Sequence, residues 1–599
     1  HTIDGGQALT LVSGTAATTI TGNIGAGTAL TGLTITNGTA NGTITFGGNI
    51  GDGSGAGVEG TTSIGNTNTA DLNFNSTIYS FDGATTITAA SGDNIDIAAG
   101  ADTTFTTAAD NITFATANIE LANGSDLTVD TGAAGGNITI GEIDGDSVET
   151  VTLDAGSGTT SVGVIGTGTE IGAVSIGSAE NGGITLNGAI TTDGAVTIDG
   201  PVTLATGAIS VTTANDAITF NHTIDGGQAL TLVSGTAATA IQGEIGGNTA
   251  ISSLTITNGT ANGTIEISNI GGVTGATAIG NTNTGTITLD GTAYTTTGTQ
   301  TYTAATGQNI DITGAATFTT TNSNIAFNTS GVDLANNGTT TINTGAGAGT
   351  VTFGAAIEGN SATSPFNDLL VITSGTGDVT FTGAIGATNA LGGLSVNESS
   401  GNGDITFTST IGDTGNAGVV GTTSIGNTNT ADLNFNSTIY SFDGATTITA
   451  ASGDNIDIAA GADTTFTTAA DNITFATANI ELANGSDLTV DTGAAGGNIT
   501  IGEIDGDSVE TVTLDAGSGT TSVGVIGTGT EIGAVSIGSA ENGGITLNGA
   551  ITTDGAVTID GPVTLATGAI SVTTANDAIT FNHTIDGGQA LTLVSGTAA

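Results

Sequence analysis

The stretch FNHTIDGGQALTLVSGTAA at residues 220–238 decides the fold. It returns at residues 581–599, and its last seventeen residues also open the chain. Alternating apolar and polar residues, Ile218-Thr219-Phe220 and Leu230-Thr231-Leu232, lie on either side of the Gly226-Gly227 pair. This pattern predicts short strands separated by glycine turns. Because the chain begins and ends inside this motif, we expect it to be part of a longer repetitive protein.

A short period surrounds this stretch. Side chains two positions apart face the same side of a strand, and such apolar pairs recur at Val196/Ile198, Val202/Leu204, Ile209/Val211, Ile218/Phe220 and Leu230/Leu232. Matching members of these pairs step from position 196 to 218, from 202 to 224 and from 209 to 230. The spacing predicts an all-β fold, a parallel β-helix (β-solenoid) with about 22 residues and three short strands per coil, hence roughly 27 coils. No segment has a helical period, so we expect almost no helix.

The expected corners of the coil are dipeptides that favour turns. They are Asp199-Gly200, Thr206-Gly207 and Gly226-Gly227, and Pro201 and Pro562 stand at strand starts, where proline is tolerated. The three histidines, His1, His222 and His583, occupy one repeat position. We interpret them as packed or corner residues, because no recurring partners accompany them that would make a metal or catalytic site.

A long period organises the chain. Residues 60–238 and 421–599 are identical at a shift of 361, and residues 1–44 resemble 222–265 at a shift of 221. We therefore expect one continuous rod. Its predicted units are 1–221 (unit A), 222–361 (the shorter unit B), 362–582 (unit A′) and 583–599 (the start of the next unit).

The charge balance limits the partners. The chain has 54 acidic residues and no lysine or arginine, a formal net charge of −54. It therefore lacks the side chains that neutralise nucleic-acid phosphates or hold an anionic membrane surface. No apolar run reaches the ~20 residues of a membrane span, so we expect no membrane insertion in this segment. An apolar fraction of 37% favours a packed repeat protein over disorder.

The acidic segment GEIDGDSVET and its second copy are the strongest candidate site. Their carboxylates are Glu142, Asp144, Asp146 and Glu149, repeated at Glu503, Asp505, Asp507 and Glu510. Clustered carboxylates suit Ca²⁺, which makes calcium the candidate cofactor, although the spacing is not that of an EF-hand or a calcium β-roll. Solvated loop acids are the simpler interpretation. A polysaccharide-cleaving enzyme also uses paired carboxylates, but a site duplicated along a repeat, without basic residues, argues against an enzyme.

Other residue patterns test further functions. Thr-x-Thr triplets such as Thr43-Ile44-Thr45 would suit an ice-binding surface, although threonine is also a common outward strand residue. An adhesin would need an exposed aromatic cluster or a non-repeating insertion. The chain has only four tyrosines, Tyr79, Tyr294, Tyr302 and Tyr440, and one insertion-like dipeptide, Pro365-Phe366, which favours a spacer.

The phrases ALTLVSGTAATTITGNIGAGTALTGLTITNG (8–37) and TGTQTYTAATGQNIDITGAATFTTT (297–321) resemble the strand repeats of giant bacterial surface proteins. These are grouped with filamentous haemagglutinin-like adhesins. The resemblance covers the whole chain and rests on a low-complexity pattern. It implies a right-handed parallel β-helix, export to the cell surface, and a filamentous or adhesive role.

Two functional hypotheses follow. The first is a structural, extracellular β-solenoid segment that acts as a stiff filament, stalk or spacer on a bacterial cell surface. The alternative is an adhesin that mediates attachment through the solenoid flank. Expected partners are the protein itself, through end-to-end continuation or lateral bundling, divalent cations, and a host or partner cell surface.

Overall fold

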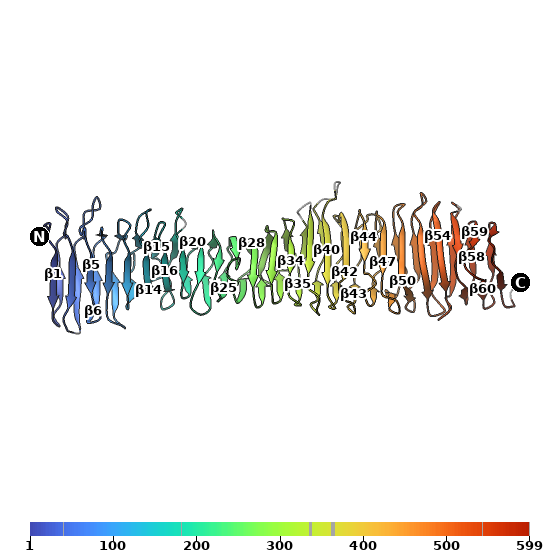
Figure 1. Ribbon diagram of the computed structural model, residues 1–599, viewed down its shortest axis with the longest axis horizontal. Helices are drawn as coiled ribbons and strands as arrows, with labels where there is room; N and C mark the ends of the chain where they lie inside the picture. The colour runs from blue at the N-terminus through green and yellow to red at the C-terminus, as the bar shows by residue number, and fades with distance from the viewer. Residues whose placement is uncertain (40, 181, 335–337, 361–365, 542, 598–599) are drawn as a thin grey trace. The chain divides into compact units, whose positions relative to one another are not determined.

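A computed structural model describes residues 1–39, 41–180, 182–334, 338–360, 366–541 and 543–597. Across these residues the chain forms strands and turns and no helix (Figure 1). All the strand pairings between these elements are parallel, and they stack the chain as a β-solenoid of about 24 turns. The prediction of an all-β parallel β-helix is therefore confirmed.

The strand pairs predicted from spacing are the pairs that form. β20 (Val196–Asp199) pairs with β23 (Ile218–Phe220), and Val196 faces Ile218. β21 (Val202–Leu204) pairs with β24 (Ile224–Asp225), and β22 (Ile209–Thr213) pairs with β25 (Ala229–Ser234). Each coil here contains three strands, as the sequence predicts.

The contacts divide the chain into two compact units, His1–Ile287 and Thr288–Ala599. This boundary does not coincide with any of the predicted repeat joins at positions 222, 362 and 583. Strand β30 (Thr284–Leu289) runs across it. Units A, B and A′ therefore describe repeats in the sequence, and they are not the two compact units of the structure.

Three faces make up the first unit. Face A contains β1 (Leu9–Ser13), β3 (Leu33–Asn37), β5 (Thr62–Gly65), β8 (Thr85–Thr88), β11 (Ile112–Ala115), the first parts of β14 (Ile138–Asp144) and β16 (Thr160–Ile165), β18 (Ile184–Leu186), β21, β24, and the last parts of β26 (Thr239–Ile245) and β28 (Gly263–Val273). Face B contains β2 (Thr18–Ile20), β4 (Gly42–Phe46), β6 (Thr69–Phe74), β9 (Asn94–Ile97), β12 (Asn118–Leu121), the last parts of β14 and β16, β19 (Ile190–Thr192), β22, β25, β27 (Ser253–Asn258) and β29 (Thr277–Ile279). Face C contains β7 (Ile78–Ser80), β10 (Thr103–Thr106), β13 (Leu127–Asp130), β15 (Thr150–Asp154), β17 (Ala173–Gly177), β20, β23 and the first parts of β26 and β28.

The second unit also has three faces. Face D contains β31 (Ala293–Thr296), β34 (Thr317–Thr319), β37 (Thr339–Asn343), β40 (Leu369–Ser374), β42 (Gly393–Glu398), β44 (Thr423–Ile425), β47 (Thr446–Thr449), the first parts of β50 (Ile473–Leu482), β52 (Ile499–Asp505) and β54 (Thr520–Ile526), β56 (Gly544–Leu547), β59 (Val563–Leu565) and β62 (Ile585–Asp586). Face E contains β32 (Gln300–Thr303), β35 (Ile325–Asn328), β38 (Val351–Phe353), β41 (Val379–Phe381), β43 (Ile405–Phe407), β45 (Leu433–Phe435), β48 (Asn455–Ile458), the last parts of β50, β52 and β54, β57 (Ile551–Thr553), β60 (Ile570–Thr574) and β63 (Leu591–Val594). Face F contains β33 (Asn309–Ile312), β36 (Gly331–Leu334), β39 (Ile357–Gly359), β46 (Ile439–Ser441), β49 (Thr464–Thr467), β51 (Leu488–Asp491), β53 (Thr511–Asp515), β55 (Ala534–Gly538), β58 (Val557–Asp560) and β61 (Ile579–Phe581).

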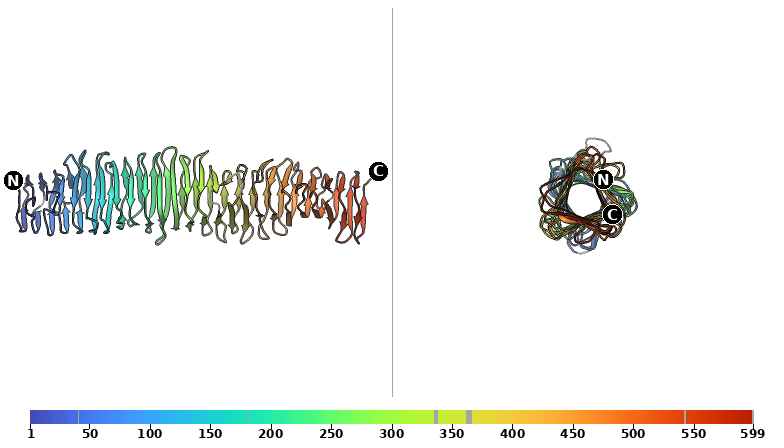
Figure 2. Two further views of the ribbon diagram at one scale, coloured as in Figure 1. Left: turned by 90° about the horizontal axis from the view of Figure 1, so that it is seen from above. Right: turned by 90° about the vertical axis from the view of Figure 1, so that its right-hand side faces the viewer.

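The uniform coil length predicted from the sequence holds only locally. The step from Ile184 to Val202 is shorter than the predicted coil, whereas the step from Thr339 to Leu369 is much longer. The chain forms about 24 turns, fewer than the sequence predicts, because most coils are longer than the ones around Val196. Most strands stay short, and the turns at the corners contain the extra residues (Figure 2).

Identical sequence occupies different faces of the first unit. LTLVS lies in β1 on face A and again in β25 on face B. The chain between the two copies thus does not close a whole number of coils. Each face offers the same parallel neighbours and the same interior, so one strand sequence fits any of them.

The core is a set of inward-facing columns. Along each strand buried and partly exposed residues alternate, as in Val196–Asp199 and Ile209–Thr213. Stacked coils turn these positions into columns of isoleucine, valine, leucine and phenylalanine that are almost fully buried. The longest aromatic column among the described residues is on face E, where neighbouring rings stack nearly parallel: Tyr302, Phe327, Phe353, Phe381, Phe407 and Phe435.

The predicted corners are confirmed. Asp199 ends β20, and the two predicted glycine corners contain Gly207 and Gly226 at φ +67° and +119°. Pro201 directly precedes β21, as Pro562 precedes β59. His222 lies at a corner and not on the face of Ile218, with Nε2 3.2 Å from Asp199 Oδ1. His583 makes the same contact with Asp560.

Gly177 is a corner where alanine should not fit. Its φ is +90°, and an added Cβ would lie 2.2 Å from the carbonyl oxygen of Asp199 in the next coil. We expect Gly177→Ala to lower the free energy of unfolding by about 1–3 kcal/mol, because both the backbone and its neighbour must shift. Gly227→Ala is the control, since its Cβ would meet nothing within 4 Å. Equal effects of the two changes in urea unfolding would contradict this prediction.

Candidate functional site: acidic columns and the groove at Asp413

The acidic segment at Glu142 covers the end of β14 and the turn after it. Glu142 and Asp146 are exposed, whereas Asp144 and Glu149 are 8% and 0% exposed. The four predicted carboxylates therefore do not share one environment.

Asp144 fastens its own coil to its neighbours. Its Oδ1 accepts hydrogen bonds from the backbone N–H groups of Gly168 at 2.9 Å and Thr169 at 3.3 Å. Its Oδ2 accepts one from Asn118 Nδ2 at 3.0 Å. Gly168 and Thr169 belong to the following coil and Asn118 to the preceding one, so a single carboxylate joins three coils.

Glu149 likewise binds its own turn to the preceding coil. One carboxylate oxygen accepts from the N–H of Gly124 at 2.9 Å and the other from the N–H of Asp146 at 2.6 Å. A fully buried carboxylate needs such donors, because burial removes its water. Both buried acids therefore have a structural explanation.

The second copy repeats this arrangement in the second unit. Asp505 and Glu510 accept the corresponding bonds at 2.6 to 3.3 Å. Glu503 is partly exposed and Asp507 is exposed. Among the described residues, no three histidine or acidic side chains form a group that could hold a metal ion. Calcium at these eight positions stays a prediction, without support from the geometry.

The register does create acidic columns that the sequence analysis missed. Acidic column I, on face B, contains Asp96, Glu120 and Asp144. Column II, on face F, contains Asp311, Asp333 and Glu358. Column III, on face E, contains Asp457, Glu481 and Asp505. The signal was available in the strand sequences NIDI, NIEL and GEID, about one coil apart.

Burial and crowding raise the pKa values of one acid in each of columns I and III, Asp96 and Asp457. Burial is the largest cause for Asp96, whose pKa rises to about 6, and the charges of Asp71 and Glu120 add to it. The pKa of Asp457 also rises to about 6, through burial and then the charges of Asp432 and Glu481. The acids that meet lie in neighbouring coils of different sequence, and for Asp96 and Asp457 desolvation raises the pKa more than charge repulsion does.

In column II, burial is again the largest cause of the raised pKa values. Burial raises the pKa of Asp311, Asp333 and Glu358, and the charge of Asp333 adds to it for the other two. Asparagine amides supply donors where the chain has no basic residue. Asn94 Nδ2 donates to Glu120 at 2.5 Å, and Asn309 Nδ2 donates to Asp333 at 2.6 Å.

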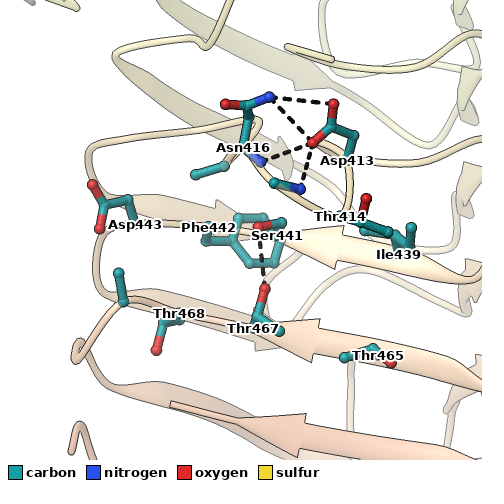
Figure 3. A pocket seen from close by; sticks show the side chains of 13 residues that line it. Asp413, Thr414, Asn416, Ile439, Ser441, Phe442, Asp443, Thr465, Thr467 and Thr468 are labelled. Atoms are coloured by element: carbon teal, nitrogen blue, oxygen red, sulfur yellow. Dashed lines mark hydrogen bonds between the residues drawn. The ribbon is translucent and has the colours of Figure 1, made fainter. Parts of the chain in front are cut away.

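A groove of about 530 Å³ lies beside the turn at Asp413 in the second unit (Figure 3). The Asp413 carboxylate accepts bonds from the N–H groups of Gly415 at 2.7 Å and Asn416 at 2.8 Å. These donors lower the pKa of Asp413. Below the turn, Thr467 Oγ1 donates to Ser441 Oγ at 3.1 Å. The groove therefore presents hydroxyl and amide groups suited to a polar ligand.

The threonine positions form single columns. On face C the outward residues of successive coils are Thr104, Thr128, Thr152, Ser175 and Thr197. The adjacent column, two positions further along each strand, begins Thr106, Asp130 and Asp154. Aspartates thus interrupt the regular double array of threonines that an ice-binding face would need.

The fold and these sites define the class of the protein as an acidic parallel β-solenoid. Comparison with family models, curated proteins and solved structures finds no match for the chain. In the part of the chain that the structure describes, no helix is long and apolar enough to span a membrane.

Proposed function

We propose that this chain is a structural segment of an extracellular filament, stalk or spacer on a bacterial cell surface. Its mechanism is mechanical. The observation that carries the proposal is the stacking within each unit, where parallel strands and buried columns continue from coil to coil. On face F, isolated bridges at Ile385 and Ile411 connect β39 to β46. Backbone hydrogen bonds then run along the stack and resist extension.

The surface favours a spacer over an adhesin. Tyr79, Tyr294, Tyr302 and Tyr440 are all 0% exposed and contribute to the core. The large apolar side chains exposed among the described residues are valine, leucine and isoleucine, such as Val148 and Val509. Of the dipeptide Pro365-Phe366, Pro365 lies outside the described residues. With 54 acids and no basic residue, the segment also repels its own copies, which supports solubility.

Electron microscopy tests the spacer. An antibody raised against this segment should label thin fibres projecting from intact cells of the native bacterium, at regular positions along each fibre. Label confined to the cell interior, or to amorphous material, would rule out the filament.

The adhesin that binds through its flank is the second candidate, and the groove at Asp413 favours it. Replacing Asp413 and Asn416 with alanine should then abolish attachment of coated beads to host or partner cells. Alanine at Asp52 and Ser54 is the control, because this is the corresponding turn of the first unit and Ser54 donates there to Asp52 as Asn416 does to Asp413. Attachment that survives the first pair of changes removes the groove from consideration.

A further inference from the structure

One buried carboxyl group lies where the other copies of its strand have an amide. Glu398 ends β42 on face D and is 1% exposed. The corresponding residue is Asn37 in β3 and Asn258 in β27, both 0% exposed. Each of the three lies directly over a serine in the preceding coil: Ser13, Ser234 and Ser374.

The two asparagines act as donors at this position. Asn37 Nδ2 donates to Ser13 Oγ at 2.8 Å and to the carbonyl oxygen of Gly14 at 3.3 Å. Asn258 Nδ2 donates to Ser234 Oγ at 3.0 Å and to the carbonyl oxygen of Ala237 at 3.3 Å. At this position the preceding coil therefore offers hydrogen-bond acceptors, and the residue at the end of the strand has to supply the donor.

Glu398 meets the same acceptors with one oxygen unpaired. Its Oε2 accepts a bond from the N–H of Gly403 at 2.9 Å, whereas Oε1 and the hydroxyl of Ser374 have no hydrogen-bond partner. Oε1 and the carbonyl oxygen of Gly377, the equivalent of Ala237, both lie 2.7 Å from the point where a Cβ on Gly403 would stand. An ionised carboxylate only accepts, so it cannot satisfy this carbonyl.

The surrounding charges also oppose ionisation. Burial is the main cause of a Glu398 pKa raised to about 8, and the carboxylates of Asp404 and Asp378 add to it against the opposing bond from Gly403. The strands on either side, β40 and β44, contain no charged residue. The chain has no lysine or arginine that could pair with the group.

We propose that Glu398 is an uncharged carboxylic acid in the folded chain, and that its Oε1–H donates to the carbonyl oxygen of Gly377 and holds two coils together. Because the group has a higher pKa folded than unfolded, its stabilisation is complete below the unfolded value and is lost as pH rises through the folded one. The contact between β40 and β42 is thus pH-sensitive, and it opens locally more often as pH rises from about 5 to about 8. Asn37 and Asn258 make the corresponding contact between coils through an amide, which does not titrate.

Hydrogen exchange of the whole chain tests this contact. After correction for intrinsic rates, opening at β40 and β42 should increase by up to about tenfold per pH unit between pH 5 and 8. Opening at β25 and β27, the contact at Asn258, should stay constant in the same molecule. Glu398→Gln, which retains a donor, should remove the pH dependence, and so should Glu398→Asn. A pH dependence that persists in Glu398→Gln would overturn the proposal.

A second measurement does not depend on the variants folding. The infrared spectrum of the native chain at pH 6.5 should contain the C=O band of one or more buried protonated carboxyl groups that exchange slowly with solvent. With Glu labelled by ¹³C, the shifted band should be present, because the pKa of Glu398 is raised to about 8. Complete ionisation of the labelled glutamates at pH 6.5 would refute an uncharged Glu398.

Discussion

Phe381→Ala should lower the free energy of unfolding by about 3–5 kcal/mol, the usual loss for a buried aromatic residue. Phe381 is 1% exposed and stacks between Phe353 and Phe407. Its ring centroid lies 5.5 Å from the first and 4.8 Å from the second, each with an interplanar angle of 4°. Removing the ring leaves a cavity between two coils, because the hydrogen-bonded strands on either side cannot move together to fill it. Urea unfolding followed by circular dichroism measures the loss.

Two further variants separate burial from stacking. Phe381→Leu retains most of the buried apolar volume, so its loss should be smaller and close to the worth of the aromatic contacts, about 1 kcal/mol each. Phe366→Ala is the matched control, because Phe366 is only partly buried and lies outside the aromatic column. A loss for Phe381→Ala no larger than that for Phe366→Ala would mean that the column does not stabilise the fold.

The melting temperature should be highest in mild acid and should fall as pH rises from about 4 to about 6. Asp96 and Asp457 have folded pKa values near 6, above the ordinary value of 3.8. The unfolded chain releases these protons first, so the folded state loses stability over that range. Both acids are partly exposed, so each effect should be well below the limit of about 1.4 kcal/mol per pKa unit.

Replacing both acids with asparagine should make the melting temperature less dependent on pH between about 4 and about 6. The double variant Asp96→Asn, Asp457→Asn should melt higher than the native chain at pH 7, because the amide needs no proton to avoid the repulsion. Asp102→Asn, at an exposed acid outside the columns, should leave this pH dependence unchanged. If the native melting temperature is flat from pH 4 to 6, crowding in the columns has no effect on stability.

Calcium should act on the same repulsion. At pH 7 and constant ionic strength, Ca²⁺ should raise the melting temperature and increase light scattering as cations bridge carboxylates within and between molecules. The double variant should respond less. A response equal to that of matched Na⁺ would reduce the acids to a solubilising coat, and the cation-bridging idea would then fail.

The sequence determined the type of strand, its partner and its corners. The pairs at Val196, Val202 and Ile209 follow from apolar residues two apart that recur one coil later. Parallel pairing between adjacent coils is a nearly local event, so a pattern confined to one repeat and its neighbour contains the necessary information. The turns at Gly207 and Gly226 are likewise local, because glycine tolerates positive φ without help from the fold.

Only the tertiary structure decided which outward residues meet. The similar strand sequences NIDI and NIEL indicate that Asp96 could lie beside Glu120. The length of a coil varies along the chain, so counting positions cannot establish that pairing, nor show that LTLVS changes face between β1 and β25. The burial of Asp144, Glu149 and Glu398 could not be predicted from the sequence either, because the variable coil length determines which groups lie beside them. A carboxylate becomes a buried hydrogen-bond acceptor or a neutral acid according to the donors that the next coil places beside it, and that placement depends on every turn in between.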